Sequence, residues 1–202
     1  MEEMTMPKKR ETRSFQNFEI RASEEDSETY LVEGYASTFQ PYVMMTIDGV
    51  DYSERIDRAA FDNADMSDVV FRVDHAGPVY ARTSNGAIQL DIDSHGLHNV
   101  TDLGRTERSR QLYEDIAAGN YPKMSFCFSV AADHYDSETR TRVIDAIEKV
   151  FDISPVSFPA NPGTELDVSA RDYFNGVIEM EKAERLEAQR KRLRIKLKTL
   201  ED

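Results

Sequence analysis

Ser125 is the residue of this sequence best placed to act as a nucleophile. It lies in the segment KMSFCFSV, in which large apolar residues alternate with small ones as on a β-strand. The alternation puts Ser125 on the face opposite the apolar residues, facing outward or into a cleft. A serine hydroxyl is a poor nucleophile until a base takes its proton and a third group orients that base. The chemistry therefore requires a histidine and a carboxylate from elsewhere in the chain.

Among the four histidines, His75 has the position expected of such a base. It ends the apolar run 69–73, which predicts a buried strand, and a rigid element would hold its imidazole in place. His95 falls in a turn, His98 in an exposed alternating strand and His134 in a polar stretch. We therefore predict that His75 is the base, with a capped or partly buried structural histidine as the alternative.

Asp152 is the carboxylate that stands out, because it lies inside the apolar run VFDISPV. Burial of a carboxylate is costly unless the group is paired, so this position predicts a partner. The alternative is that Asp152 lies at the edge of a strand and accepts hydrogen bonds from backbone amides. Asp74 and Glu148 are rivals. Adjacent strand residues point to opposite faces, which argues against Asp74 orienting His75, and Glu148 looks more exposed.

Cys127 is an alternative nucleophile. Strand alternation places Cys127 and Ser129 on the same face as Ser125, so a cysteine–histidine peptidase is chemically possible. Small buried cysteines are common in strands, which favours Ser125. Because the chain has one cysteine, no intrachain disulfide can form and a reducing compartment fits.

The elements that must position these residues are mostly short strands. Apolar residues alternate, or form short buried runs, in several segments separated by polar turns. In the turn Ser94-His95-Gly96, glycine is available for a positive φ. The expected strands are 15–21, 30–38, 69–73, 87–92, 97–103, 123–130 and 153–158.

Two or three helices accompany these strands. A short helix is expected over 55–64, and a second follows the cap residue Thr106 and stops at Gly119. Residues 40–53 are expected to form a loop, and residues 142–151 are compatible with either a helix or a strand. Because strands mostly follow strands, the pattern predicts an α+β fold whose core is a curved β-sheet or β-barrel, flanked by a few helices.

Charge and periodicity divide the chain into three parts. Residues 1–14 lack periodicity and are expected to form a flexible arm, and 15–175 to form the main domain. Residues 176–202 are expected to form a basic, helical tail, with Leu186, Leu193 and Leu200 seven apart as on a weak coiled-coil seam. From residue 179 to the end the net charge is +2, whereas the rest of the chain carries −15.

Composition excludes several classes of protein. The 202 residues are 40% hydrophobic and 31% charged, as in a globular domain. No stretch has the roughly 20 apolar residues of a membrane span, and the charged N-terminus is not a secretory signal. Motifs for phosphate, dinucleotide or zinc binding are missing from the sequence, so no cofactor or metal is expected. An acidic body also disfavours nucleic acid.

Four segments together resemble the prohead maturation serine proteases of tailed phages, which are distant relatives of the herpesvirus capsid-maturation protease. The resemblance covers roughly residues 30–170, and four motifs in order are more specific than any one of them. The segments are VDHAGPVYART, AIQLDIDSHGLHNVTDL, AAGNYPKMSFCFSV and VFDISPVSFPANPGT.

The resemblance implies a role for one residue in each of four motif positions. In that family a histidine follows a strand, an arginine comes several residues later, the nucleophile lies in Met-Ser-Phe, and an acid precedes a proline-rich turn. These positions are His75, Arg82, Ser125 and Asp152. His75 would take the proton of Ser125, Asp152 would orient the imidazole, and Arg82 or backbone amides near it would stabilise the oxyanion. The alternative for Arg82 is a surface ion pair.

Two departures from the family's pattern concern the site. Cys127 stands where the family usually has glycine. The third member of the family's triad is often glutamate, and the herpesvirus relatives use a second histidine. His98 and His134 therefore stay open as alternatives to Asp152.

The resemblance also implies where the protein acts and on what. It implies a serine endopeptidase inside the phage procapsid, in the cytoplasm of the bacterial host, that cleaves segments of the scaffold and the major capsid protein, and itself. The portal and a second copy of the chain are further candidate partners; nucleic acid and membranes are not. The tail would recruit the enzyme into the shell or be removed by self-cleavage.

Three other functions fit the residues. The chain could be a catalytically inactive assembly factor with a protease-like fold, although all three triad residue types are present. It could be a Cys127-dependent peptidase. It could also be an esterase with the same triad, although the G-x-S-x-G motif of common α/β-hydrolases is missing from the sequence.

Overall fold

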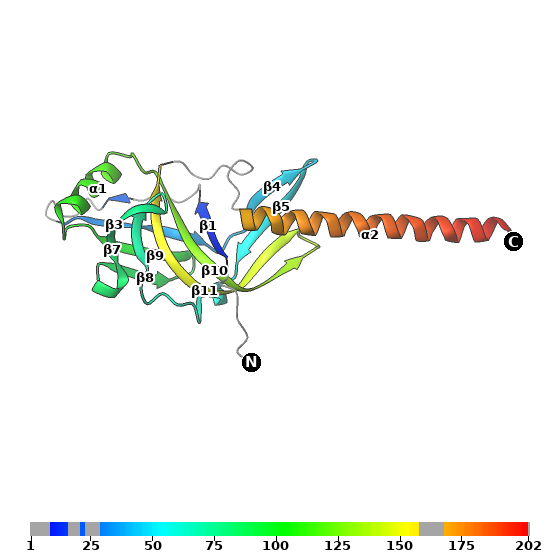
Figure 1. Ribbon diagram of the computed structural model, residues 1–202, viewed down its shortest axis with the longest axis horizontal. Coiled ribbons are helices and arrows are strands. Elements are labelled where there is room, and N and C mark those ends of the chain that lie inside the picture. Colours follow the sequence, from blue (N-terminus) through cyan, green and yellow to red (C-terminus); the bar gives the residue numbers. More distant parts are fainter. Residues whose placement is uncertain (1–8, 16–20, 23–28, 158–167, 202) are drawn as a thin grey trace. The chain divides into compact units, whose positions relative to one another are not determined.

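The computed structural model describes residues 9–15, 21–22, 29–157 and 168–201, in an α+β fold made mostly of strands (Figure 1). The chain divides into two compact units, Met1–Leu166 and Asp167–Asp202. The described residues of the first unit form one mixed sheet, one antiparallel sheet and one α-helix, and those of the second form a single helix. The predicted α+β class is confirmed.

The larger sheet carries the predicted site residues. Its central strand is β11, which runs parallel to β5 in its first half and parallel to β6 in its second half, and is antiparallel to β10 throughout. In spatial order the strands are β1 (Arg10–Phe15), β10 (Lys123–Asp136), β11 (Thr141–Val156), β5 (Val50–Ile56) and β4 (Tyr42–Ile47), with β6 (Val70–Val73) and β7 (Ala76–Arg82) branching from β11.

The smaller sheet packs against the larger one through β3, which contacts both β1 and β10. A helix and two 3₁₀ turns complete this unit. The remaining elements are β2 (Arg21–Ala22), β3 (Leu31–Thr38), β9 (Gly96–Asp102) and β8 (Ile88–Ile92) in spatial order, then η1 (Arg58–Phe61), η2 (Thr83–Asn85) and α1 (Glu107–Ala117).

The core lies on the inner face of the larger sheet. Phe126 and Phe128 stack with their ring centroids 4.4 Å apart, and both are fully buried. Phe71 on β6 and Ile153 on β11 are paired in register and belong to the same core. Because side chains alternate along a strand, this packing fixes which residues of β10 and β11 face the other way.

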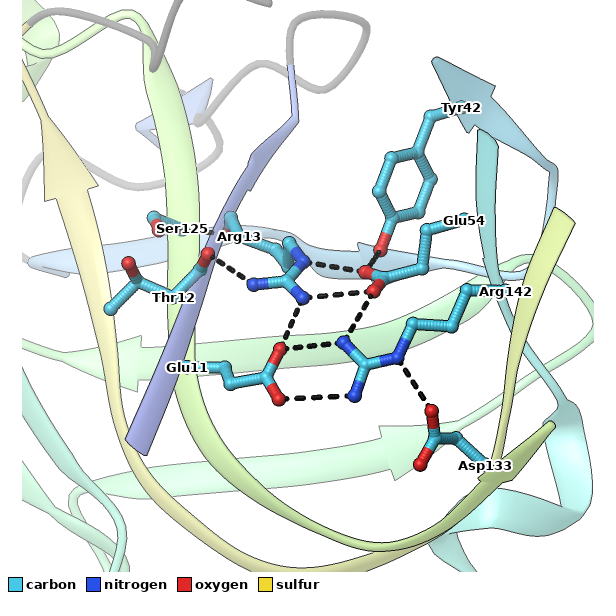
Figure 2. A network of polar contacts seen from close by, with 8 residues as sticks. All are labelled: Glu11, Thr12, Arg13, Tyr42, Glu54, Ser125, Asp133 and Arg142. Atoms are coloured by element: carbon cyan, nitrogen blue, oxygen red, sulfur yellow. Dashed lines mark hydrogen bonds and ion pairs between the residues drawn. The ribbon is translucent and has the colours of Figure 1, made fainter. Parts of the chain in front are cut away.

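A cluster of buried charges joins β1, at one end of this sheet, to β5 and β11 (Figure 2). Arg13 on β1 binds both oxygens of Glu54 on β5, at 2.5 and 2.8 Å, and also binds Glu11. Arg142 on β11 binds both oxygens of Glu11 and one of Glu54. These four residues, called here the ion-pair cluster, are at most 5% exposed and carry no net charge. Their contacts link β1, at one end of the sheet, to β11 and β5.

The charges of the ion-pair cluster shift the pKa values of acidic groups in and around it. Tyr42 on β4 donates to Glu54 at 2.6 Å, and burial together with that carboxylate raises the pKa of Tyr42 well above its ordinary value. Burial alone would raise the pKa of Glu11, but Arg142 and Arg13 outweigh it and hold the pKa below the usual 4.5. The stabilisation from Glu11 is therefore complete above about pH 4.5 and is lost as acid protonates it.

Several predicted elements are confirmed. Strands β3, β6, β8 and β9 match the expected 30–38, 69–73, 87–92 and 97–103 within two residues. Helix α1 begins after Thr106, whose side chain accepts from the amide of Ser109, and Gly119 follows it with a φ of 82°. The undecided segment 142–151 is a strand, part of β11. No closed barrel forms among the described strands, because β1 and β4 end the ladder without pairing to each other.

Other expectations are wrong. Residues 10–14, expected to be part of a flexible arm, belong to β1. Residues 42–53 of the loop expected over 40–53 belong to the β4–β5 hairpin. Asp48 and Gly49 at its tip both have positive φ. The helix expected over 55–64 is a single 3₁₀ turn. The strand expected over 15–21 lies mostly outside the described residues, and the proline-rich turn that follows Asp152 in the family's motif lies outside them.

Gly96 is needed for close packing rather than for a positive φ. A Cβ built on it would lie 1.8 Å from the carbonyl oxygen of Ser37, which no relaxation of a flexible side chain could relieve. Gly96 is not among the glycines with positive φ. The turn from β8 to β9 therefore lies where it was expected. Its glycine is required for close packing against Ser37 and not for a positive φ.

The second unit is the helix α2 (Val168–Glu201), which starts before the predicted tail boundary at residue 176. Its exposed apolar side chains include Leu186 and Leu193 of the predicted seam. Neither α1 nor α2 has the long apolar run that crossing a membrane requires.

Replacing Arg13 by alanine is expected to destabilise the protein strongly. The variant leaves the Glu54 carboxylate, which is fully buried, without its bidentate partner, and breaking a buried pair in this way costs about 3–5 kcal/mol. Arg55→Ala breaks a surface pair with Asp57 and should cost about 0–1 kcal/mol. Urea unfolding of the two variants measures the difference, and equal losses would contradict a structural role for the cluster.

Candidate active site

His75 lies in a tight, strained turn between two short strands. Val73 and Ala76 are paired, so Asp74 and His75 form a two-residue hairpin connection between β6 and β7. Both have positive φ, 46° and 55°, a conformation that asparagine and glycine adopt far more easily. Non-glycine residues held in this region cluster at functional sites, where the surrounding structure maintains the strain.

Hydrogen bonds to the end of β11 hold this turn in place. The amide of Asp74 donates to Pro155 O at 3.1 Å, and the amide of His75 donates to Ser154 Oγ at 3.3 Å. In return, the amide and the hydroxyl of Ser157 each donate to the Asp74 carboxylate at 3.0 Å. Asp74 was considered as a rival of Asp152 for orienting His75. It instead stabilises the turn that carries His75.

Ser125 and Asp152 share one face of the larger sheet, opposite the core. In the ladder between β10 and β11, Ser125 pairs with Ser154 and Cys127 pairs with Asp152. On its other side Asp152 pairs with Val70 of β6, so it sits on a strand that has neighbours on both sides. That position explains why its carboxylate is only 4% exposed although it faces away from the core.

Three of the four predicted site residues meet. His75 Nδ1 lies 2.6 Å from Asp152 Oδ1, and His75 Nε2 lies 2.6 Å from Ser125 Oγ. Because an ionised carboxylate only accepts hydrogen bonds, Nδ1 carries a proton and Nε2 is left to accept from the hydroxyl. Ser154 Oγ also donates to Asp152 Oδ1, at 2.8 Å, and fixes the carboxylate from a second direction.

Burial differs sharply among the three. Ser125 is 0% exposed, so it does not face solvent, whereas the ring of His75 keeps 21% of its side-chain surface. A hydroxyl, an imidazole and a carboxylate in this order can transfer the serine proton to the imidazole, and the buried carboxylate can stabilise the imidazolium.

Arg82 does not join this group of contacts. Its register partner is Val70, which places it on the same face of the sheet as Asp152, two strands away. Its guanidinium binds Asp68 at 3.1 Å, and both side chains are 44% exposed. This is the surface ion pair considered as the alternative for Arg82.

The other candidates lie elsewhere. His134 binds the Asp145 carboxylate at 2.6 Å on the exposed end of the β10–β11 hairpin. His95 and His98 both pack against the ring of Tyr35, in the smaller sheet. Glu148 accepts from Ser129 Oγ at 3.2 Å. None of these contacts involves His75.

Ser154 is a site residue that the sequence reasoning missed. The spacing Asp152-Ile153-Ser154 carries the signal, because residues two apart on a strand share a face. A search for polar residues two positions from a buried acid would have found it. The described residues contain no group of three or more His, Cys, Asp or Glu side chains that could hold a metal ion.

Comparison with known proteins identifies one family. The family model described as caudovirus prohead serine protease matches residues 16–177, which include all of these site residues. No curated protein and no solved structure matches the chain.

Ser154→Ala is expected to slow turnover about tenfold without unfolding the protein. The variant removes one of the two hydrogen bonds on Asp152 Oδ1 and the acceptor of the His75 amide, so the imidazole loses part of its orientation. Ser84→Ala is the control, because its hydroxyl donates to Asp68 on the surface. Equal rates for the two variants, measured at equal folded fractions, would contradict the positioning role.

Proposed function

This chain belongs to the family of caudovirus prohead serine proteases, and on that premise we propose that Ser125, His75 and Asp152 are its catalytic triad. The observation that carries the proposal is the continuous chain of contacts from Asp152 Oδ1 through both ring nitrogens of His75 to Ser125 Oγ. The family implies a protease of capsid maturation that acts in the procapsid, with capsid proteins as substrates.

The first step of the reaction follows from this geometry. Ser125 Oγ bonds the carbonyl carbon of a substrate peptide while its proton passes to His75 Nε2, and the resulting imidazolium is stabilised by Asp152. His75 then gives that proton to the leaving amine, which leaves an acyl-enzyme. Water, activated by the same imidazole, hydrolyses the acyl-enzyme. Because His75 is the exposed member of the three, the substrate is proposed to approach from its side.

The geometry favours Ser125 over Cys127 as the nucleophile. Both ring nitrogens of His75 are already engaged, one by Asp152 and the other by Ser125. A thiol at position 127 would need one of these nitrogens as its base. The Cys127-dependent peptidase is therefore the weaker proposal, and the inactive assembly factor becomes an outcome of the cleavage experiment below.

Arg82 is proposed to stabilise the oxyanion after leaving its partner. The surface pair with Asp68 is worth about 0–1 kcal/mol, so a substrate could draw the guanidinium away at small cost. A new charged hydrogen bond to a developing oxyanion is worth more than the pair that is lost.

The finer points of function are also proposals. The scaffold and the major capsid protein are proposed as substrates, together with the chain itself, and the portal or a second copy as partners. The interior of the procapsid in the host cytoplasm is the proposed location. The basic helix α2 is proposed to recruit the enzyme to the shell, since residues 185–198 contain seven basic residues and one acid.

Co-expression of the full chain with the capsid protein of the same phage tests the nucleophile. We expect wild type, Cys127→Ala and Ser129→Ala to produce capsid-protein fragments, and Ser125→Ala to produce none. Ser129→Ala is the matched control, because it changes the same residue type on the same strand face. Intact masses of all products give the cut sites. Loss of cleavage in Cys127→Ala with cleavage kept in Ser125→Ala would reverse the assignment, and no cleavage by wild type would favour the inactive assembly factor.

Arg82→Ala is expected to lower the initial rate of capsid-protein cleavage about a hundredfold, as is typical when one oxyanion donor is removed. Thermal unfolding should hardly change, because the residue contributes only a surface pair. Arg55→Ala, which also breaks a surface pair, should cleave at the wild-type rate. A rate for Arg82→Ala within twofold of that control would refute the oxyanion role.

A further inference from the structure

Ser125 has a second hydrogen-bond partner that the proposed reaction does not use. Its Oγ lies 2.8 Å from the main-chain carbonyl oxygen of Arg13 on β1, besides 2.6 Å from His75 Nε2. The hydroxyl carries one hydrogen and donates to one acceptor at a time. The carbonyl of β1 and the imidazole of the β6–β7 turn therefore compete for the proton that must move in the first step.

The contact with Arg13 can exist only before the attack. Once Oγ has bonded a substrate carbon, its hydrogen has passed to His75, and the Arg13 oxygen then faces an oxygen that has nothing to donate. An interaction made in the ground state and lost in the transition state raises the barrier to reaction. The carbonyl of Arg13 is thus placed to restrain the nucleophile.

The ion-pair cluster holds that carbonyl where it is (Figure 2). Arg13 pairs in register with Phe126, so its side chain lies on the inner face, where it binds Glu54 and Glu11. The next residue, Ser14, pairs with Ser125 on the opposite face. One residue of β1 therefore connects the buried charges on one side of the sheet with the nucleophile on the other.

Resting on the proposed function, we propose that β1 restrains the active site. Arg13 is a positioning residue whose main-chain carbonyl competes with His75 for the hydrogen of the Ser125 hydroxyl in the resting enzyme. The ion-pair cluster, through the side chain of Arg13, keeps the carbonyl in that position. Movement of β1 away from β10 would free the hydroxyl and speed the attack.

A single ester bond tests the restraint in the full-length chain. The α-hydroxy acid analogue of serine at position 14 converts the peptide bond after Arg13 into an ester, whose carbonyl is a weaker acceptor, and leaves every side chain unchanged. The readout is the rate of inactivation by a fluorophosphonate: Ser125 Oγ bonds phosphorus, fluoride leaves, and the hydroxyl proton passes to His75. We expect this rate to rise about two- to fivefold, because the competing hydrogen bond is weakened but not removed.

The matched control carries the α-hydroxy analogue of threonine at position 12. It weakens the carbonyl of Glu11, which points the same way as that of Arg13 because it is two residues away on the same strand, and it likewise removes one strand amide. The control should be inactivated at the wild-type rate. A merely structural role of β1 predicts instead that both esters change the rate alike.

A side-chain pair tests the part played by the ion-pair cluster. Glu54→Gln keeps the size of the side chain but removes the charge that binds Arg13, and we expect it to speed inactivation. Asp133→Asn removes a carboxylate charge that binds Arg142 through Nε at 2.8 Å, and should leave the rate unchanged. If Glu54→Gln fails to fold, the ester at position 14 still decides the question.

The proposal and its premise fail in different ways. A position-14 ester that reacts no faster than wild type, while the position-12 ester matches wild type, overturns the restraint. Labelling of Ser125→Ala at the wild-type rate overturns the nucleophile assignment itself. Faster labelling of the position-14 ester alone supports the restraint, because only that ester weakens the oxygen that faces Ser125.

Discussion

The site depends on one carboxylate that is buried in the middle of a β-sheet. Asp152 lies on a strand with neighbours on both sides, where an unpaired charge would be very costly. Its oxygen is satisfied by His75 Nδ1 and Ser154 Oγ, and the first of these contacts fixes the tautomer that leaves Nε2 facing Ser125. The strained turn carrying His75 is what brings an imidazole to this place, and its hydrogen bonds to the end of β11 offset the strain.

The two faces of the same sheet hold two different kinds of polar structure. On the inner face, charges from β1, β5 and β11 neutralise one another and link β1 to β5 and β11. On the other face, β10 carries Ser125 and β11 carries Asp152. Arg13 belongs to both, through its side chain on one side and its carbonyl on the other. Arg13 therefore connects the buried charges on one face of the sheet with the hydroxyl of Ser125 on the other.

Ser125 and Asp152 could be predicted from the sequence, because the residues around each of them indicate which way its side chain faces. Alternation in KMSFCFSV placed Ser125 opposite the core, and an acid inside an apolar run marked Asp152. Strand β1 was missed because its inner face carries Glu11 and Arg13 instead of apolar residues, and their partners lie 41 to 131 residues away. The β4–β5 hairpin was missed although Asp48-Gly49 is a strong hairpin signal, and the burial of Ser125 depends on contacts between distant strands that no local pattern records.

The most direct test of the account is to find which residue a fluorophosphonate modifies in the full-length wild-type chain. Digestion and mass spectrometry of the inactivated protein locate the adduct. The contacts among Asp152, His75 and Ser125 predict one adduct, on Ser125, and predict that Asp152→Asn forms it far more slowly because the wrong tautomer of His75 is favoured. An adduct on Cys127 or elsewhere, or equal labelling of wild type and Asp152→Asn, would contradict the central claim that this buried carboxylate activates Ser125 through His75.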